Sequence, residues 1–102
     1  MRGALLAPLV LSAWVALPTL AEIAVIDDTG AAVRLREPAR RIVTLAPHTT
    51  ELVYAAGAGG ALVATVEHSD EPPAARSVPR IGGLAGVDRE RLLAARPDLV
   101  VA

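Results

Sequence analysis

The feature that most constrains the fold is an alternation of strand-like and helix-like segments over residues 41–102. Segments suited to strands and to helices follow one another in the order 42–45, 49–56, 61–66, 89–95 and 99–102. Continuous apolar strands of this kind are typical of parallel sheets that are buried on both faces. Right-handed crossovers would then pack the helices against the sheet. We therefore predict an α/β fold with a parallel, Rossmann-like sheet.

The first helix has recognisable start and stop signals. Thr49 is a suitable N-cap, and Glu51 in the first turn would face the positive end of the helix dipole. Leu52 and Val53 fall on the face that we expect to be buried. Gly57 is placed to end the helix.

The second helix is predicted over residues 89–95, with Asp88 as its N-cap and with Leu92 and Leu93 facing inward. The segment before it, residues 67–80, contains three prolines. Proline removes a backbone donor and fixes φ, so this segment is predicted to be neither a helix nor an interior strand.

The first 21 residues have the order of features of a cleaved secretion signal. Arg2 supplies the positive charge, residues 4–17 form an uncharged apolar stretch, and Thr19 and Ala21 are small residues before the cleavage position. The alternative is a buried or membrane-anchoring helix, but about 20 apolar residues are needed to cross a bilayer. We predict a signal peptide at 1–21, leaving 81 of the 102 residues in a mature protein that does not span a membrane.

The next segment, residues 22–40, is predicted to form an N-terminal hairpin followed by a short polar link. Apolar residues at 23–26 and 33–35 would form the two arms, and residues 27–30, Asp-Asp-Thr-Gly, have turn chemistry. The α/β part of the chain would then occupy residues 41–102.

Composition excludes several classes of function. The chain has no Cys, hence no disulfide and no lipid-modified cysteine after the signal, and the periplasm fits the secretion signal best. Loss of Arg2 would shift the formal charge from −1 to −2, which argues against a nucleic-acid partner. A nucleophile elbow and a phosphate-binding glycine loop are absent from the sequence, so we predict that the protein is not an enzyme.

Candidate ligand-binding residues lie where the predicted strands end. Ligands of open parallel sheets bind outside the carboxyl ends of the strands. Pro47, His48 and Thr49 follow the first strand, His68 follows the second, and Leu84 lies in a glycine-rich segment expected near the same edge. The simpler alternatives are that His48 only makes a backbone contact at the start of the helix and that the His68 side chain is solvated in its loop.

A metal site is a further alternative for this edge. His48, Glu67, His68 and Asp70 offer nitrogen and oxygen ligands of the types found in zinc or manganese sites. Their spacing matches no compact metal-binding motif, and Glu67 and Asp70 are more simply explained as a solvated loop face. We therefore assign no metal ligands.

An ordered set of segments resembles one family. The resemblance is carried by residues 41–47 (RIVTLAP), 50–52 (TEL), 55–57 (AAG), 68–75 (HSDEPPAA), 79–83 (PRIGG), 88–93 (DRERLL) and 96–100 (RPDLV). In this order they resemble the start of the periplasmic cobalamin and iron-chelate binding proteins, which include haem and ferric-siderophore binders. The hairpin at 22–40 also fits that family.

The resemblance implies the soluble substrate-binding component of an ATP-binding-cassette importer. Such a protein has two α/β lobes, holds a metal chelate non-covalently in the cleft between them, delivers it to a permease and catalyses nothing. Residues 41–102 would be an incomplete first, N-terminal lobe, and cobalamin is the favoured ligand. The position that matches the family's first-lobe docking glutamate is Glu90, which would pair with arginines of the permease.

Departures from the family pattern leave alternatives open. Cobalamin binders tend to carry aromatic residues where this chain has His68, Glu71 and Leu84, and a haem binder would often have a tyrosine near Leu84. The alternatives are a haem or ferric-siderophore receptor, a zinc or manganese ion receptor, and a truncated fragment that is not functional alone because it lacks a second lobe.

Overall fold

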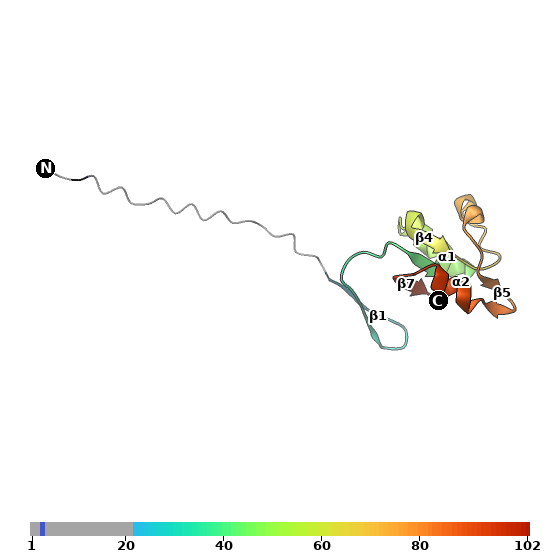
Figure 1. Cartoon of the computed structure of the whole chain (residues 1–102), viewed down its shortest axis with the longest axis horizontal. Helices are drawn as coiled ribbons and strands as arrows, with labels where there is room; N and C mark the ends of the chain where they lie inside the picture. The colour runs from blue at the N-terminus through green and yellow to red at the C-terminus, as the bar shows by residue number, and fades with distance from the viewer. Residues whose placement is uncertain (1–2, 4–21) are drawn as a thin grey trace.

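The computed structural model describes Gly3 and residues 22–102 (Figure 1). The predicted signal peptide, residues 1–21, lies outside the described residues apart from Gly3. The elements, in chain order, are β1 (Ile23–Ile26), β2 (Ala32–Leu35), β3 (Ile42–Thr44), α1 (Pro47–Ala55), η1 (Gly59–Ala61), β4 (Leu62–Ala64), η2 (Pro73–Ser77), β5 (Gly82–Gly83), β6 (Gly86–Val87), α2 (Arg89–Ala94) and β7 (Leu99–Val101). Among the described residues, no helix has the length and apolar character needed to cross a membrane.

The central element is a three-stranded parallel sheet with the order β4-β3-β7. Ile42 of β3 pairs with Leu62 on one side and with Leu99 on the other. Past the end of β4, Thr65 forms a parallel bridge with Arg80, which adds the segment before β5 to the outer edge. The chain therefore builds outward from β3 on one side and then returns to the other side at β7. This arrangement confirms the predicted parallel α/β fold.

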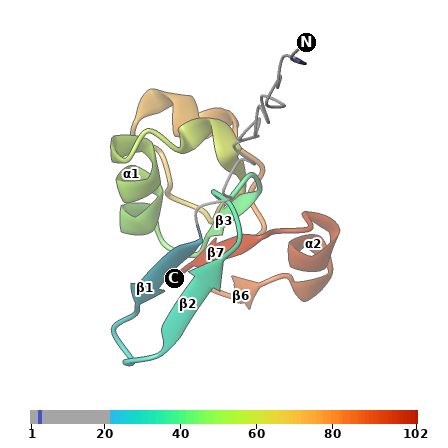
Figure 2. The same cartoon turned by 90° about the vertical axis from the view of Figure 1, so that its left-hand side faces the viewer.

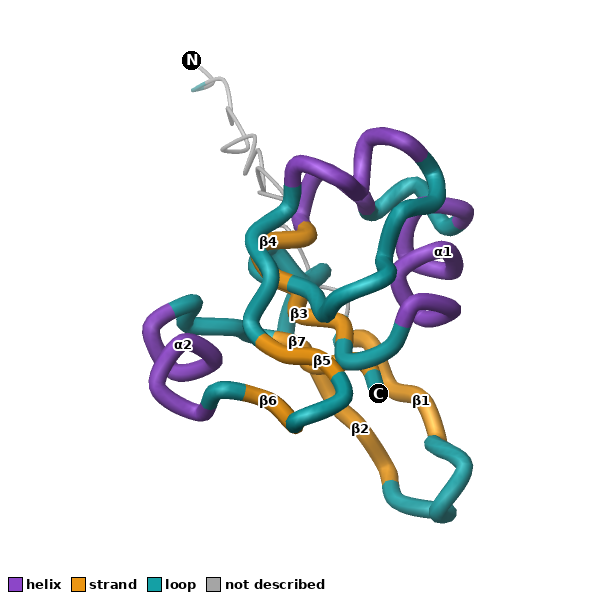
Figure 3. The backbone as a smooth tube through the Cα atoms, turned by 90° about the vertical axis from the view of Figure 1, so that its right-hand side faces the viewer, coloured by secondary structure: helices purple, strands orange, loops and turns teal. Residues whose placement is uncertain are grey.

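The sheet is covered on both faces because successive residues of a strand point to opposite sides. Ile42 packs in a cluster with Val53 of α1 and Leu62 of β4. Its neighbour Val43 packs in a second cluster that includes Leu92 of α2. Figures 2 and 3 show α1 and α2 on opposite sides of the sheet. All of β3 is buried, as its β-branched and largely apolar sequence indicated.

The start of α1 differs from the prediction. Ala46 is the N-cap and Pro47 is the first helical residue, a position that proline favours because its missing N–H would have no helical partner there. Thr49 therefore lies inside the helix, where its hydroxyl donates to the carbonyl of Ala46 at 2.8 Å. No acidic residue lies in the first turn, so the prediction for Glu51 was also wrong.

The rest of α1 follows the prediction in part. Val53 is buried but Leu52 is 62% exposed, because residues next to each other on a helix point about 100° apart. The helix ends at Ala55 with Ala56 as its C-cap, and Gly57 follows with a φ of +80°, as predicted for a residue that stops the helix. The N–H of Gly57 donates to the carbonyl of Tyr54, and the N–H of Ala58 donates to that of Val53, a Schellman arrangement.

The second helix has the predicted cap. Asp88 accepts hydrogen bonds from the N–H groups of Glu90 and Arg91 at 3.0 and 3.2 Å. Leu92 packs against the sheet, but Leu93 is 76% exposed, so the prediction that both leucines face inward was wrong for Leu93. The proline-rich loop was also mispredicted in part, because it contains the short 3-10 helix η2.

The N-terminal hairpin is confirmed. β1 and β2 pair antiparallel, with Ile23 opposite Leu35 and Ile26 opposite Ala32. Asp27 holds the turn by accepting from the N–H groups of Thr29 and Ala31. The hydrogen bond from the Thr29 hydroxyl, followed by that from the Ala31 backbone, lowers the pKa of Asp27.

Candidate functional site

A cavity of about 260 Å³ lies at the carboxyl ends of β3 and β4. Its lining comprises Leu45, Ala46, Pro47, Val66, Glu67, His68, Gly83, Leu84 and Val87. The structure therefore brings together three of the predicted ligand-binding residues, Pro47, His68 and Leu84, from three separate loops. We call this the rim cavity.

The other two predicted residues do not line the rim cavity. His48 is exposed on the first turn of α1, next to Pro47. Thr49 is only 3% exposed, and its hydroxyl is already hydrogen-bonded to the carbonyl of Ala46. A ligand seated in the rim cavity would reach His48 more easily than Thr49.

One side of the rim cavity is a hairpin that the sequence did not predict. Strands β5 and β6 pair Gly82 with Val87 and Gly83 with Gly86, and they present Leu84 at the tip, fully exposed. A Cβ atom on Gly82 would lie 2.5 Å from the carbonyl oxygen of Gly86, so only glycine allows the two strands to approach this closely.

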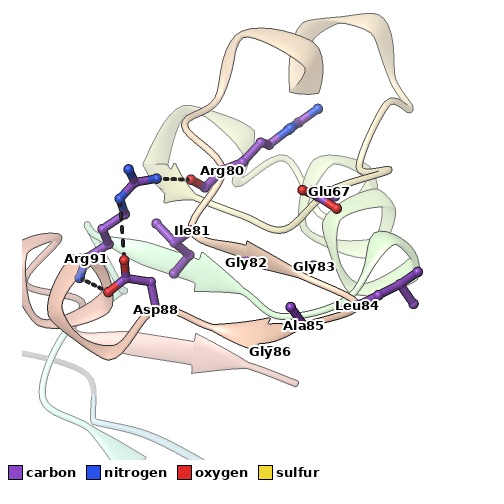
Figure 4. A pocket seen from close by; sticks show the side chains of 10 residues that line it. All are labelled: Glu67, Arg80, Ile81, Gly82, Gly83, Leu84, Ala85, Gly86, Asp88 and Arg91. Carbon is purple, nitrogen blue, oxygen red and sulfur yellow. Dashed lines mark hydrogen bonds and ion pairs between the residues drawn. The ribbon is translucent and has the colours of Figure 1, made fainter.

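A second cavity, of about 500 Å³, also borders this hairpin and shares Glu67, Gly83 and Leu84 with the rim cavity. Figure 4 shows Leu84 at the end of the hairpin, apart from the other labelled side chains, and Arg91 beside Asp88. The Arg91 Nε lies 3.6 Å from an Asp88 carboxylate oxygen, and its Nη1 donates to the Arg80 carbonyl at 3.4 Å. Of the charged side chains that line this cavity, Asp88 and Arg91 pair with each other, whereas Arg80 pairs with Asp70 outside the lining.

The backbone at His68 is in the left-handed region, with a φ of +67°. Histidine visits this region more often than most side-chain-bearing residues, and strained backbone of this kind concentrates at functional sites. The preceding residue is tied to the hairpin, because the N–H of Glu67 donates to the carbonyl of Gly82 at 2.8 Å. His68 therefore lies between the first strand's loop and the β5–β6 hairpin.

Beneath the rim lies a cluster of four buried hydroxyls that the sequence interpretation missed, formed by Thr44, Thr50, Thr65 and Ser69. None of the four residues is more than 1% exposed. The signal that could have revealed part of it is Thr44, a polar residue inside an otherwise apolar strand. We call these four side chains the hydroxyl cluster.

The remaining predicted site residue, Glu90, is separate from both cavities. It is exposed in the first turn of α2, one position after Arg89 and two after the capping Asp88. Within the described residues, no group of three or more His, Cys, Asp or Glu side chains is arranged to hold a metal ion. The zinc or manganese alternative therefore gains no support from the geometry.

Comparisons with known proteins show which class of proteins this chain resembles. No protein-family model matches the chain. In the search of solved structures, it is similar to the periplasmic vitamin B12-binding protein BtuF of Vibrio cholerae, with a TM-score of 0.62 and 48% identity over 64% of this chain and 26% of that one. It is also similar to a periplasmic haem-binding protein from Pseudomonas aeruginosa, with a TM-score of 0.58 and 30% identity over 62% of this chain and 23% of that one.

Curated proteins with similar sequences are named vitamin B12-binding proteins. The vitamin B12-binding protein of Vibrio campbellii is 46% identical over 65 residues, and that of Vibrio cholerae serotype O1 is 48% identical over 65 residues. Each match covers 64% of this chain and 24% of the relative. The chain thus spans about a quarter of the length of the curated relatives that it matches, and the resemblance to periplasmic cobalamin and iron-chelate binding proteins is confirmed. These relatives are named as binding proteins, not as enzymes.

Proposed function

We propose that this chain supplies one wall of the ligand site in the substrate-binding component of an ATP-binding-cassette importer, and that the ligand is cobalamin. The observation that carries the proposal is the meeting of Pro47, His68 and Leu84 at one cavity on the carboxyl edge of a parallel sheet. Similarity to the vitamin B12-binding proteins supports the choice of ligand. The predicted signal at residues 1–21 would deliver the protein to the periplasm.

The size and chemistry of the rim cavity suit a wall rather than a complete site. Pockets that enclose a small-molecule ligand usually measure about 300–1,000 Å³, and the rim cavity, at about 260 Å³, is smaller. Its apolar members Pro47 and Leu84 would contact the flat face of a corrin ring. Its polar members Glu67 and His68 would reach the amide groups at the ring's edge.

Calorimetric titration of the chain with cyanocobalamin, hemin and a ferric siderophore tests this proposal, and we expect binding of cyanocobalamin. Leu84→Ala should weaken that binding about tenfold, because it removes apolar contact worth about 1.4 kcal/mol. Leu93→Ala is the matched control, because Leu93 is also exposed but lies on α2, outside both cavities. Equal affinities for the two variants would contradict the assignment of Leu84.

The second candidate ligand is haem, and the similarity to the Pseudomonas aeruginosa haem-binding protein is the observation that favours it. Binding of hemin without binding of cyanocobalamin would move the assignment to haem. Binding of the ferric siderophore alone would move it to an iron chelate of that class.

We also propose that Glu90 pairs with arginines of the permease. An exposed carboxylate on a short helix can accept two parallel hydrogen bonds from a guanidinium group, and such charge-assisted pairs are the stronger ones. Glu90→Ala should weaken binding of the chain to the permease in detergent about tenfold while leaving cyanocobalamin affinity unchanged.

The matched control for this experiment is Glu51→Ala. Glu51 is also an exposed glutamate on a helix, but it lies on α1, which covers the opposite face of the sheet (Figure 2). Permease binding that falls equally in both variants would indicate a general charge effect and would remove the docking role of Glu90.

A further inference from the structure

We propose that the hydroxyl cluster is a positioning device that fixes His68 at the rim cavity, and this inference rests on the proposed function of that cavity. His68 would contact the ligand. Thr50, Thr65 and Ser69 would act through it, as residues that hold its backbone in place.

The cluster joins four parts of the fold at one point. Thr44 belongs to β3, Thr50 to α1, Thr65 follows β4, and Ser69 lies in the loop next to His68. The Thr44 hydroxyl oxygen lies 2.7 Å from that of Thr50 and 2.8 Å from that of Thr65. The Ser69 hydroxyl oxygen lies 2.9 Å from that of Thr65 and 3.2 Å from that of Thr50.

Because the network is buried, its hydrogen bonds hold the loop that contains Ser69 in one position. A hydroxyl carries one donor and two acceptor sites, and leaving a buried polar group without a partner costs about 1–3 kcal/mol. Across the described residues, every buried side-chain nitrogen and oxygen has a hydrogen-bond partner. A displacement of Ser69 would break its two bonds to threonine hydroxyls at once, so the loop has a strong preference for its observed place.

Ser69 is also held from the other side. The Arg80 Nη2 donates to the Ser69 carbonyl at 2.9 Å and to an Asp70 carboxylate oxygen at 3.1 Å. The Arg80 Nη1 donates to the Ala75 carbonyl at 2.8 Å, which fixes the guanidinium against η2. The side chain and the carbonyl of Ser69 are thus anchored independently.

These anchors explain how His68 keeps its left-handed backbone. Glu67 on one side is bonded to Gly82, and Ser69 on the other side is bonded to the hydroxyl cluster and to Arg80. Both neighbours of His68 are therefore fixed, and its φ of +67° is imposed by them. The imidazole remains exposed and free to contact a ligand.

The test compares Ser69→Ala with Ser77→Ala in the chain. Ser77 is a serine of the same proline-rich loop whose hydroxyl donates to the Ala74 carbonyl at 3.1 Å, outside the cluster. NMR would report the His68 amide and imidazole signals and its φ-dependent three-bond coupling, and calorimetry would report cyanocobalamin affinity. We expect Ser69→Ala to move the His68 signals and to weaken cyanocobalamin binding about tenfold, and Ser77→Ala to do neither.

A second pair of variants keeps the proposal testable if Ser69→Ala does not fold. Thr50→Ser retains the hydroxyl and should keep the His68 signals in place, whereas Thr50→Val has a similar shape without the hydroxyl and should move them. Unchanged His68 signals in Ser69→Ala and in Thr50→Val would overturn the proposal. Altered His68 signals in a chain that binds no cyanocobalamin would support the positioning role and would count against the proposed ligand instead.

Discussion

Left-handed backbone occurs at three informative residues, Gly57, His68 and Arg96, with φ values of +80°, +67° and +48°. Gly57 and Arg96 occupy the same position after a helix, since each follows the C-cap residue of α1 or α2. His68 follows no helix and lies at the rim cavity. The first two therefore belong to helix termination, and His68 belongs to the site.

Gly57→Ala tests whether the left-handed backbone of Gly57 stabilises the end of α1. A side chain in the left-handed region costs about 1–2 kcal/mol, so the free energy of unfolding in urea should fall by about 1 kcal/mol. Gly60→Ala is the matched control, because Gly60 lies in open space and its φ is not in the left-handed range. An equal loss of stability in both variants would contradict the assigned role of Gly57.

Single residues also show where sequence reasoning succeeded and failed. Asp88 and Gly57 were predictable because helix caps depend on local chemistry. An N-cap side chain accepts hydrogen bonds from the free N–H groups of the first turn, and a glycine after the C-cap can adopt the left-handed backbone that ends a helix. Thr49 suits an N-cap by residue type, but Pro47 is the stronger signal, because proline favours the first helical position. The apolar character of Leu93 favours burial in the sequence, but only Leu92 faces the sheet from that turn.

At the scale of elements, Asp98 joins the start of β3 to the turn before β7. Its two carboxylate oxygens accept from the N–H groups of Arg40 and Arg41 at 2.8 and 2.9 Å. The Arg41 side chain donates in turn to the carbonyl of Ala95 at the end of α2. Hydrogen bonds from the backbone of Arg40 and Arg41 lower the pKa of Asp98 below its ordinary value.

The lowered pKa of Asp98 predicts an acid-dependent loss of stability. A carboxyl whose pKa is lower in the folded state stabilises the fold above its unfolded pKa of about 3.9, and that contribution is lost as the pH falls toward the folded pKa. Asp98→Asn should therefore be less stable than the wild type at pH 6, and the difference should shrink as the pH falls below the unfolded pKa of about 3.9.

Urea unfolding at several pH values checks this expectation, with Asp28→Asn as the control. Asp28 is exposed in the β1–β2 turn, away from β3. A stability difference between Asp98→Asn and the wild type that stays constant down to pH 2 would show that the Asp98 carboxylate does not stabilise this junction.

The β5–β6 hairpin is an element that could not be predicted from this sequence. Its segment, residues 82–87, is rich in glycine, has no aromatic residue and has a single β-branched residue, Val87, to favour a strand. Its strands form because the preceding segment pairs with Thr65 and because Gly82 allows the backbone of Gly86 to approach closely, while Gly83 leaves room for the Glu67 side chain. Those are tertiary causes, so local propensity could not reveal them, and the outer wall of the rim cavity could not be predicted.

At the scale of the whole molecule, the parallel sheet explains why distant loops meet. The strands β3 and β4 run in the same direction, so their carboxyl ends deliver Pro47 and His68 to one edge. The pairing of Thr65 with Arg80 then brings Leu84 to that edge. The meeting of Pro47 and His68 was predictable from the strand order alone, whereas the hairpin that carries Leu84 and the hydroxyl cluster depend on tertiary pairing and on the packing of α1 against the sheet.

The most direct test of the account is an NMR titration of the ¹⁵N-labelled chain with cyanocobalamin. We expect the backbone amide signals of Ala46, His68 and Leu84 to move together and to follow a single dissociation constant. The amide of Gly30, in the turn of the N-terminal hairpin, should stay in place. Shifts confined to the hairpin, or no shifts at any concentration of cyanocobalamin, would contradict the assignment of a corrinoid site to this edge.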